Sequence, residues 1–377
     1  MEAATRLAEI AQERTGLSDY GGDGFREGLE VLVASLNDEA RLTPTGDAAL
    51  RNRILMHLTQ RLSIEDWYRR HPEIADEQIT QPLFGVSLPR TGSSALSFLL
   101  ASDPNVRYLR VWESGQPCPP PATVEGPDPR RGDDTSEFAS GRVPTGVDGA
   151  MECQDLMALT MASQSFQAFA QIPSYSNWLL DADLTETYLY ERRAIKLLQW
   201  GMPTRPWRLK APTHMLYMDA LDNAFPDARF VMTHRDPTDV ILSVASLYEQ
   251  VIGRFTDHMD REYIGELNKR TWTTAMDRLI AFRDKPGNDA RFYDIHFRAM
   301  HDDPIGEVHG LYDWLGEPVT PAFDDAMNAF WQQNEERERY EKPDPAVFGI
   351  DFDEVRAQFA DYLARMERWA PYPRKTT

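Results

Sequence analysis

The chain has 377 residues, with 40 lysines and arginines against 60 aspartates and glutamates, which gives a formal net charge of −20 at pH 7. Its length allows one large buried core, and its negative field repels nucleic acid and anionic lipid, so we expect neither as the main partner. Two cysteines provide no disulfide framework, the N-terminus lacks a signal sequence, and no apolar run approaches the ~20 residues that span a bilayer, so we expect a cytoplasmic protein.

The N-terminal part, residues 1 to about 75, is predicted to be helical. Residues 48–68 place apolar side chains near the helical period of 3.6, which is typical of an amphipathic helix. A different pattern follows over residues 83–102, where an apolar run, a tight turn and a second apolar run predict a strand, a loop and a helix.

The loop of this unit is the most informative segment of the sequence. It contains Arg90, Thr91, Gly92, Ser93 and Ser94, directly before the predicted helix. Such a loop aims backbone N–H groups and a helix N-terminus at one point, which forms an anion site. The sequence therefore predicts that a phosphate-like group is held here.

The next two segments have different characters. Residues 115–149 are rich in proline, glycine and aspartate, which excludes regular structure, and residues 150–200 return to a helical pattern rich in methionine and aromatic residues. We expect these two segments to form an apolar pocket for a small molecule, with a lid, although the same residues also fit ordinary core packing. The candidate residues for binding that molecule are Phe166, Phe169, Tyr175 and Trp178.

A second alternation of strands and helices follows. Strands are predicted over 207–210, 229–234 and 291–297. Helices are predicted over 214–225 and 353–369, and a further helix is predicted to begin with Asp236 as its N-cap and Pro237 as its first residue. Alternating strands and helices favour a parallel sheet covered on both faces. The predicted fold class is therefore α/β, with a P-loop-like parallel sheet flanked by helices, a helical N-terminal region and a helical acceptor-side insertion.

The loop departs from two common nucleotide-binding patterns. No lysine follows Gly92, so the Walker A pattern is incomplete, and no strand ends in a clear magnesium-holding aspartate unless Asp294 is given that role. The dinucleotide pattern G-x-G-x-x-G is also absent. The histidines are scattered singly, and no metal-ligand spacing emerges.

Two motifs in order resemble the sulfotransferases that use 3′-phosphoadenosine 5′-phosphosulfate (PAPS), and in particular their bacterial and mycobacterial-type branch. The first is PRTGSSALSFLLASDP, which is similar to the family's 5′-phosphosulfate loop. The second is RFVMTHRDPTDVILSVASL, which is similar to its 3′-phosphate segment and contains Arg235 and Ser243. The segments WRLKAPTHMLYMDALDNAFPDARF and FGIDFDEVRAQFADYL also resemble that branch, so the resemblance covers roughly residues 80–370.

The resemblance implies one sulfotransferase domain over residues 1–377. Its parts would be a helical extension over 1–75, a phosphosulfate-loop unit over 80–115, a loop and helical acceptor region over 115–200, a 3′-phosphate-binding half over 205–300 and a helical C-terminal part over 300–377. PAPS would be the cofactor, adenosine 3′,5′-bisphosphate (PAP) the product, and no metal would be needed. The partner would be a small hydroxyl acceptor, namely an alcohol, a phenol or a lipid-like molecule.

Sulfuryl transfer to a hydroxyl group needs a general base, and two residues are candidates. Glu113 follows the strand expected over 106–111 and is the favoured base, whereas His214 is the second candidate. Glu113 would otherwise form an ion pair with Arg107 or Arg110. Lys210 and Arg90 are expected to stabilise the charge of the transferring and leaving groups.

Two other functions stay open at this level. The first is an atypical P-loop kinase acting on a nucleoside or small molecule, and the second is a non-catalytic nucleotide-binding protein of the same fold. A homo-oligomer is compatible with the sequence, which does not determine the oligomeric state.

Overall fold

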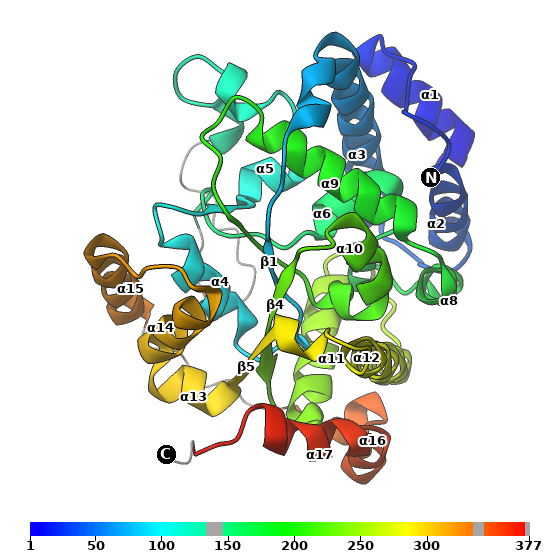
Figure 1. Ribbon diagram of the computed structural model, residues 1–377. Helices are drawn as coiled ribbons and strands as arrows, with labels where there is room; N and C mark the ends of the chain where they lie inside the picture. The colour runs from blue at the N-terminus through cyan, green and yellow to red at the C-terminus, as the bar shows by residue number, and fades with distance from the viewer. Residues whose placement is uncertain (133–145, 335–342, 374–377) are drawn as a thin grey trace.

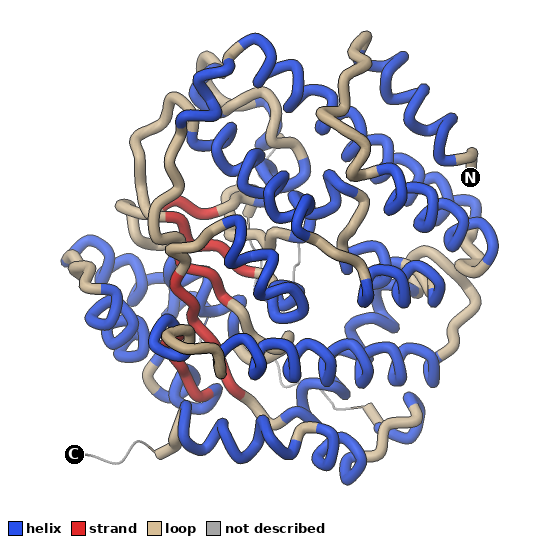
Figure 2. The backbone as a smooth tube through the Cα atoms, turned by 45° about the vertical axis from the view of Figure 1, so that its right-hand side comes forward, coloured by secondary structure: helices blue, strands red, loops and turns tan. Residues whose placement is uncertain are grey.

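The computed structural model describes residues 1–132, 146–334 and 343–373, and its centre is a sheet of five parallel strands in the order β2-β3-β1-β4-β5 (Figures 1 and 2). The strands are β1 (Leu83–Gly85), β2 (Arg107–Tyr108), β3 (Trp207–Lys210), β4 (Arg229–His234) and β5 (Phe292–His296). Because all strands are parallel, their carboxyl ends meet at one edge of the sheet. The predicted fold class, a parallel sheet flanked by helices, is confirmed.

Helices make up most of the remaining described chain. Before β3 they are α1 (Ala4–Thr15), α2 (Arg26–Asp38), α3 (Pro44–Arg70), α4 (Ser93–Ala101), α5 (Val111–Gly115), α6 (Gln154–Met157), α7 (Gln164–Phe169), α8 (Pro173–Asp181) and α9 (Thr185–Gln199). After β3 they are α10 (Met218–Ala224), α11 (Pro237–Ile252), α12 (Arg261–Arg283), α13 (Phe297–Asp302), α14 (Pro304–Leu315), α15 (Pro321–Asn334), α16 (Phe352–Gln358) and α17 (Ala360–Trp369). Short 3₁₀ helices lie at Pro72–Asp76, Pro121–Thr123, Pro129–Arg131, Ala158–Thr160, Pro212–Tyr217, Asp289–Arg291 and Pro345–Phe348.

The two faces of the sheet pack against different helices, as the alternation of side chains along a strand requires. Leu83 and Val231 point to one face and join the apolar cluster of α4, α13, α14 and α15, on the left of Figure 1. Phe84 and Phe230 point to the other face and join a larger cluster that includes α3, α9, α10, α11 and α12. The core therefore lies on both sides of a buried sheet.

The N-terminal helices belong to the larger of these clusters. Leu7 of α1 and Leu32 of α2 are fully buried in it, together with residues as distant in the chain as Tyr362 of α17. The helix predicted over 48–68 is part of α3, which begins earlier, at Pro44, because the Thr43 side chain accepts a hydrogen bond from the backbone N–H of Gly46 and proline suits the first helical position.

Several predicted elements differ from the observed ones at their ends. The strand expected over 106–111 is limited to Arg107–Tyr108, because the chain turns into α5 at Val111. The helix expected over 214–225 is split at Tyr217, whose φ of −133° is not helical, and the helix expected over 353–369 is split at Phe359.

The proline-rich segment 115–149 contains two short 3₁₀ helices in its described part, and residues 133–145 of the predicted lid lie outside the described residues. Among the described helices, none combines the length and the apolar character needed to cross a membrane.

Candidate active site

The predicted anion loop leaves β1 and enters α4 at the carboxyl edge of the sheet. Gly92 caps α4 with a φ of +89°, and Arg90 also lies in the left-handed region with a φ of +65°. A left-handed conformation costs a non-glycine residue roughly 1–3 kcal/mol, so the surrounding contacts must hold Arg90 in place. The alternation of backbone conformations turns successive N–H groups towards one side, which suits an anion.

The side chain of Thr91 anchors this loop to the sheet. It is fully buried, and its hydroxyl donates to the carbonyl of Leu88 (2.8 Å) and lies 2.6 Å from the hydroxyl of Thr233 in β4. Ser87 adds a second anchor, since its Oγ accepts a hydrogen bond from the backbone N–H of Thr233 (2.8 Å). The sequence did not single out Ser87.

The second predicted motif lies against the first. Arg90 Nε donates to Ser243 Oγ of α11 (3.1 Å), and Arg235 Nη1 donates to the carbonyl of Arg90 (2.8 Å). Arg235 also pairs with Asp239 at 3.4 Å and stacks on Phe297, with its guanidinium 4.4 Å from the ring centre. Residues 145 and 153 positions apart in sequence are thus joined at the edge of the sheet.

Lys210 ends β3 beside the same loop. Its Nζ lies 3.4 Å from Ser94 Oγ and 2.5 Å from Glu152 Oε1. Gly85 of β1 permits this approach, because a Cβ at that position would lie 2.7 Å from Lys210 Cγ. The structure therefore brings Arg90, Ser94 and Lys210 together, and their binding of an anion stays a prediction.

Glu152 also lines this candidate site, and it was not among the residues predicted from the sequence. The chain at residues 151–153 runs between two strand ends, because Met151 N donates to the carbonyl of Leu109 (2.8 Å) and Cys153 N donates to the carbonyl of Lys210 (3.1 Å). This places the Glu152 carboxylate, whose side chain is 34% exposed, next to the ammonium of Lys210. No sequence signal identifies it, since it follows the proline-rich loop and belongs to no motif.

The two bases suggested by the sequence occupy other environments. Glu113 is fully buried and forms ion pairs with both Arg107 and Arg110, the alternative expected for it. His214 is also fully buried, and its Nδ1 lies 2.9 Å from the hydroxyl of Tyr188. Burial, followed by the charge of Lys210, lowers the pKa of His214 to about 3.

A cavity of about 300 Å³ adjoins the loop, and neither Glu113 nor His214 lines it. Its polar end is formed by Arg90, Ser93, Ser94, Glu152 and Lys210. Its other walls are largely apolar and include Phe98, Ala168, Phe169, Val244, Leu247, Tyr248, Val251 and Trp272.

Of the four predicted acceptor residues, Phe169 lines this cavity. Phe166 and Tyr175 are instead buried in the core, where the Tyr175 hydroxyl donates to the carbonyl of Met161 (2.7 Å). Trp178 packs at the edge of that core and donates to Glu27 (3.0 Å). The other apolar walls named above come from α4, α7, α11 and α12, whose side chains a local pattern cannot assign to a pocket.

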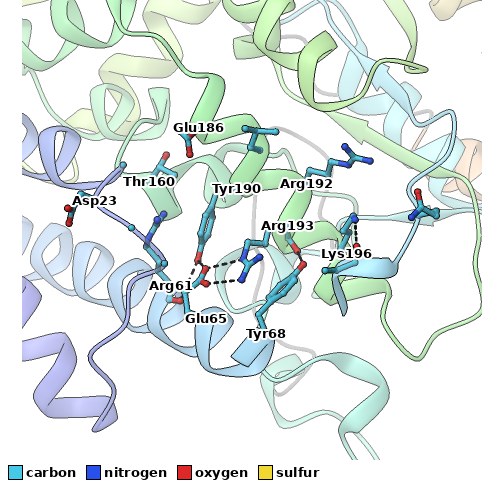
Figure 3. Close-up of a pocket in the computed structure, with 16 residues that line it drawn as sticks. Asp23, Arg61, Glu65, Tyr68, Thr160, Glu186, Tyr190, Arg192, Arg193 and Lys196 are labelled. Atoms are coloured by element: carbon cyan, nitrogen blue, oxygen red, sulfur yellow. Dashed lines mark hydrogen bonds and ion pairs between the residues drawn. The ribbon is translucent and has the colours of Figure 1, made fainter. Parts of the chain in front are cut away.

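A larger cavity, of about 620 Å³, lies between α3, α9 and the turn at residues 21–24 (Figure 3). Its charged groups largely satisfy one another. Glu65 accepts hydrogen bonds from Tyr190 (2.9 Å) and Arg193 (2.8 Å), and Lys196 donates to the carbonyl of Ala75 (2.6 Å). None of the predicted site residues lines it.

Comparisons with known proteins agree with this geometry. A family model described as "Sulfotransferase family" matches residues 82–321. The crystal structure of sulfotransferase STF9 from Mycobacterium avium is similar, with a TM-score of 0.88 and 28% identity over 97% of this chain and 97% of that chain. The structure of sulfotransferase STF1 from Mycobacterium tuberculosis H37Rv is similar with a TM-score of 0.84 and 29% identity, over 96% and 99% of the two chains. A search of curated protein sequences found no match.

Proposed function

The chain belongs to the sulfotransferase family, and from this premise we propose that it moves the sulfuryl group of PAPS to a hydroxyl group of a small hydrophobic acceptor. The observation that carries the proposal is the meeting of an anion loop, a cation and a carboxylate at one end of an apolar cavity. The loop and the cation suit an anionic donor, and the apolar walls suit the acceptor.

The donor set fits the two charged ends of PAPS. Arg90, Ser94, Lys210 and the N–H groups at the start of α4 would hold the 5′-phosphosulfate. Arg235 and Ser243, which lie against the loop, would hold the 3′-phosphate. When bound, PAPS supplies a sulfuryl group attached to a phosphate leaving group.

Glu152 is the carboxylate best placed to act as general base, in preference to Glu113 and His214. It accepts the proton of the acceptor hydroxyl, whose oxygen forms the new bond to sulfur in line with the breaking sulfur–phosphate oxygen bond. The products are a sulfate ester and PAP, and the proton remains on Glu152.

Lys210 has a complementary task at the same position. Its ammonium has three N–H donors, so it can contact the leaving phosphate oxygen while it stays near Glu152. Arg90 and Lys210 together offset the negative charge that develops on the leaving group, which requires no metal ion at the reacting atoms.

Calorimetry with PAP and with ATP–Mg²⁺ tests the donor assignment. We expect PAP to bind without added metal and ATP–Mg²⁺ to bind much more weakly or not at all. Binding of ATP–Mg²⁺ without binding of PAP would instead establish the kinase alternative.

The acceptor class is tested by incubating the protein with labelled PAPS and panels of alcohols, phenols and lipids, read by the mass of the product. Sulfated products are expected for apolar members that fit a cavity of about 300 Å³. If PAP binds but no member of any panel is sulfated, the non-catalytic alternative is favoured.

A further inference from the structure

Three side chains that can ligate metal ions meet in the core, next to the segments that carry Glu152 and Lys210. They are Cys153, directly before α6, Glu191 of α9, and His214 of the 3₁₀ helix at Pro212–Tyr217. The potential ligand atoms of the three all lie within 4.8 Å of one another. Each of these side chains is fully buried.

The polar atoms of this cluster lack ordinary partners. Neither carboxylate oxygen of Glu191 has a hydrogen-bond partner of normal geometry among the described residues, and His214 Nε2 also has none. The neighbouring Cys153 thiol interacts with the Glu191 carboxylate, but a thiol offers only one weak donor. Leaving buried polar atoms short of partners costs about 1–3 kcal/mol per group, and a bound cation would satisfy these atoms.

The orientation of His214 is set by its other ring nitrogen. Its Nδ1 lies 2.9 Å from the hydroxyl of Tyr188, which is itself fully buried. If Nδ1 carries the hydrogen and donates to this hydroxyl, Nε2, which has no hydrogen-bond partner among the described residues, keeps a free lone pair that can bind a metal ion. A neutral imidazole whose second nitrogen is held by a hydrogen bond is the form in which histidine binds a metal ion.

We propose that Cys153, Glu191 and His214 bind one structural Zn²⁺ ion. Zinc accepts sulfur, oxygen and nitrogen ligands at about 2.0–2.3 Å, which places tetrahedral ligands about 3.5 Å apart, so only a small closure of the observed cluster is needed. One thiolate and one carboxylate together neutralise the ion, and a water molecule completes the tetrahedron.

Charge balance explains why such a cluster can persist in the core. Complete burial disfavours the charged forms of both the Glu191 carboxyl and the Cys153 thiol when no cation is present. A divalent cation reverses this preference, because it stabilises both anions.

The position of the cluster indicates a supporting role. Cys153 follows Glu152 in the chain, and its backbone N–H donates to the carbonyl of Lys210 (3.1 Å). A metal ion here would join α9 to the two segments that carry the Glu152–Lys210 pair, without touching the reacting atoms. The proposal of a metal site does not depend on the proposed sulfuryl transfer being correct.

The test begins with the full chain produced with added zinc and without a metal-affinity tag. Elemental analysis by mass spectrometry is expected to find about one zinc ion per chain. Zinc X-ray absorption is expected to show one sulfur ligand together with nitrogen and oxygen ligands. Replacement by Co²⁺ should produce a thiolate-to-cobalt charge-transfer band.

Cys118 provides a matched control, because it is the other cysteine of the chain and is also buried and free. Cys153→Ala should abolish the cobalt band and the bound zinc, whereas Cys118→Ala should keep both. If Cys153→Ala does not fold, X-ray absorption of the wild-type protein still identifies the sulfur ligand.

Three results would overturn the proposal. One is a wild-type chain that contains no zinc and develops no cobalt band when titrated with Co²⁺. Another is metal that remains in Cys153→Ala or has no sulfur ligand. The third is an infrared band of a protonated carboxylic acid that disappears in Glu191→Gln, because it would show that Glu191 is a neutral acid.

Discussion

At the scale of single residues, the two candidate carboxylates, Glu113 and Glu152, differ in the groups that surround them. Glu113 is enclosed by two arginines, whereas Glu152 is partly exposed and faces a cavity and one lysine. The oxygens of a carboxylate enclosed by guanidinium groups are already occupied by hydrogen bonds and are held in one orientation. Position in the structure, more than residue type, therefore guides our proposal of Glu152 as the general base.

Glu152→Gln should lower the turnover of PAPS by about 100-fold or more, because the amide cannot accept the proton of the acceptor. PAP affinity should change little in the same variant, as measured by calorimetry. Glu113→Gln should instead lower the melting temperature, since it leaves Arg107 and Arg110 short of a partner. If folded Glu113→Gln lost turnover while Glu152→Gln kept normal turnover, Glu113 would be the general base and Glu152 would not.

Arg90→Ala should weaken PAP binding by about 10- to 100-fold, the effect of removing one charge-assisted hydrogen-bond donor. Arginine and alanine are equally strained at the φ of +65° of position 90, so the backbone strain is similar in the wild type and in Arg90→Ala. Ser243→Ala removes a neutral partner and should have a smaller effect in the same titration. Equal affinity of the wild type and Arg90→Ala would contradict the placement of the phosphosulfate at this loop.

At the scale of elements, two junctions hold the carboxyl edge of the sheet in place. The first is the close approach of β1 to β3 at Gly85, and the second is an ion-pair network that joins β4, β5 and α12. In that network Asp294 accepts from His234 Nε2 (2.8 Å) and from both terminal nitrogens of Arg283 (2.8 and 2.9 Å). Each junction makes a separate prediction.

Gly85→Ala should displace the Lys210 side chain, because its new Cβ would lie 2.7 Å from Lys210 Cγ. We expect a loss of about 1–3 kcal/mol in the free energy of unfolding, together with a lower turnover number. Gly115→Ala is the control, since its Cβ would meet Met56 at an ordinary 3.7 Å. Denaturant titration gives the free energy of unfolding of both variants, and steady-state kinetics give their turnover numbers. Equal values for Gly85→Ala and Gly115→Ala would contradict the predicted clash with Lys210.

Asp294→Asn should destabilise the protein by about 3–5 kcal/mol, the usual cost of removing one partner of a buried ion pair. Burial alone would raise the pKa of Asp294, but hydrogen bonds from His234 and Arg283 outweigh it and hold the pKa below its ordinary value. The resulting stabilisation is therefore complete above about pH 4 and is lost as the pH falls further. Unfolding curves should show that this loss is smaller in Asp294→Asn, and an unchanged acid dependence would refute the assignment.

At the scale of the whole molecule, one apolar core extends from the N-terminal helices to α17. We therefore predict one cooperative unfolding transition, with equal calorimetric and van't Hoff enthalpies. Leu32→Ala in α2 and Leu279→Ala in α12 should each cost about 2–5 kcal/mol and shift that same transition. Two resolved transitions, with one substitution acting on each, would divide the chain into separate domains.

The parts of the fold that were predictable from sequence are those with local signals. β3 and β4 end where their patterns end, and Asp236 and Pro237 begin α11 as expected. Predictions were less accurate at β2 and at Tyr217, because tertiary contacts, and not local periodicity, determine where the chain leaves a strand or a helix.

The same division applies to function. Local patterns predict the loop at Arg90–Ser94 and the turn and helix at Arg235–Ser243, because backbone turns and helix starts depend on neighbouring residues; their binding of anions stays a prediction. No local pattern shows that Glu152 faces Lys210, or that Cys153, Glu191 and His214 meet in the core, and these contacts come from the packing of distant segments. Those side chains come from separate elements with no common spacing, so their chemistry exists only once the sheet and helices have packed.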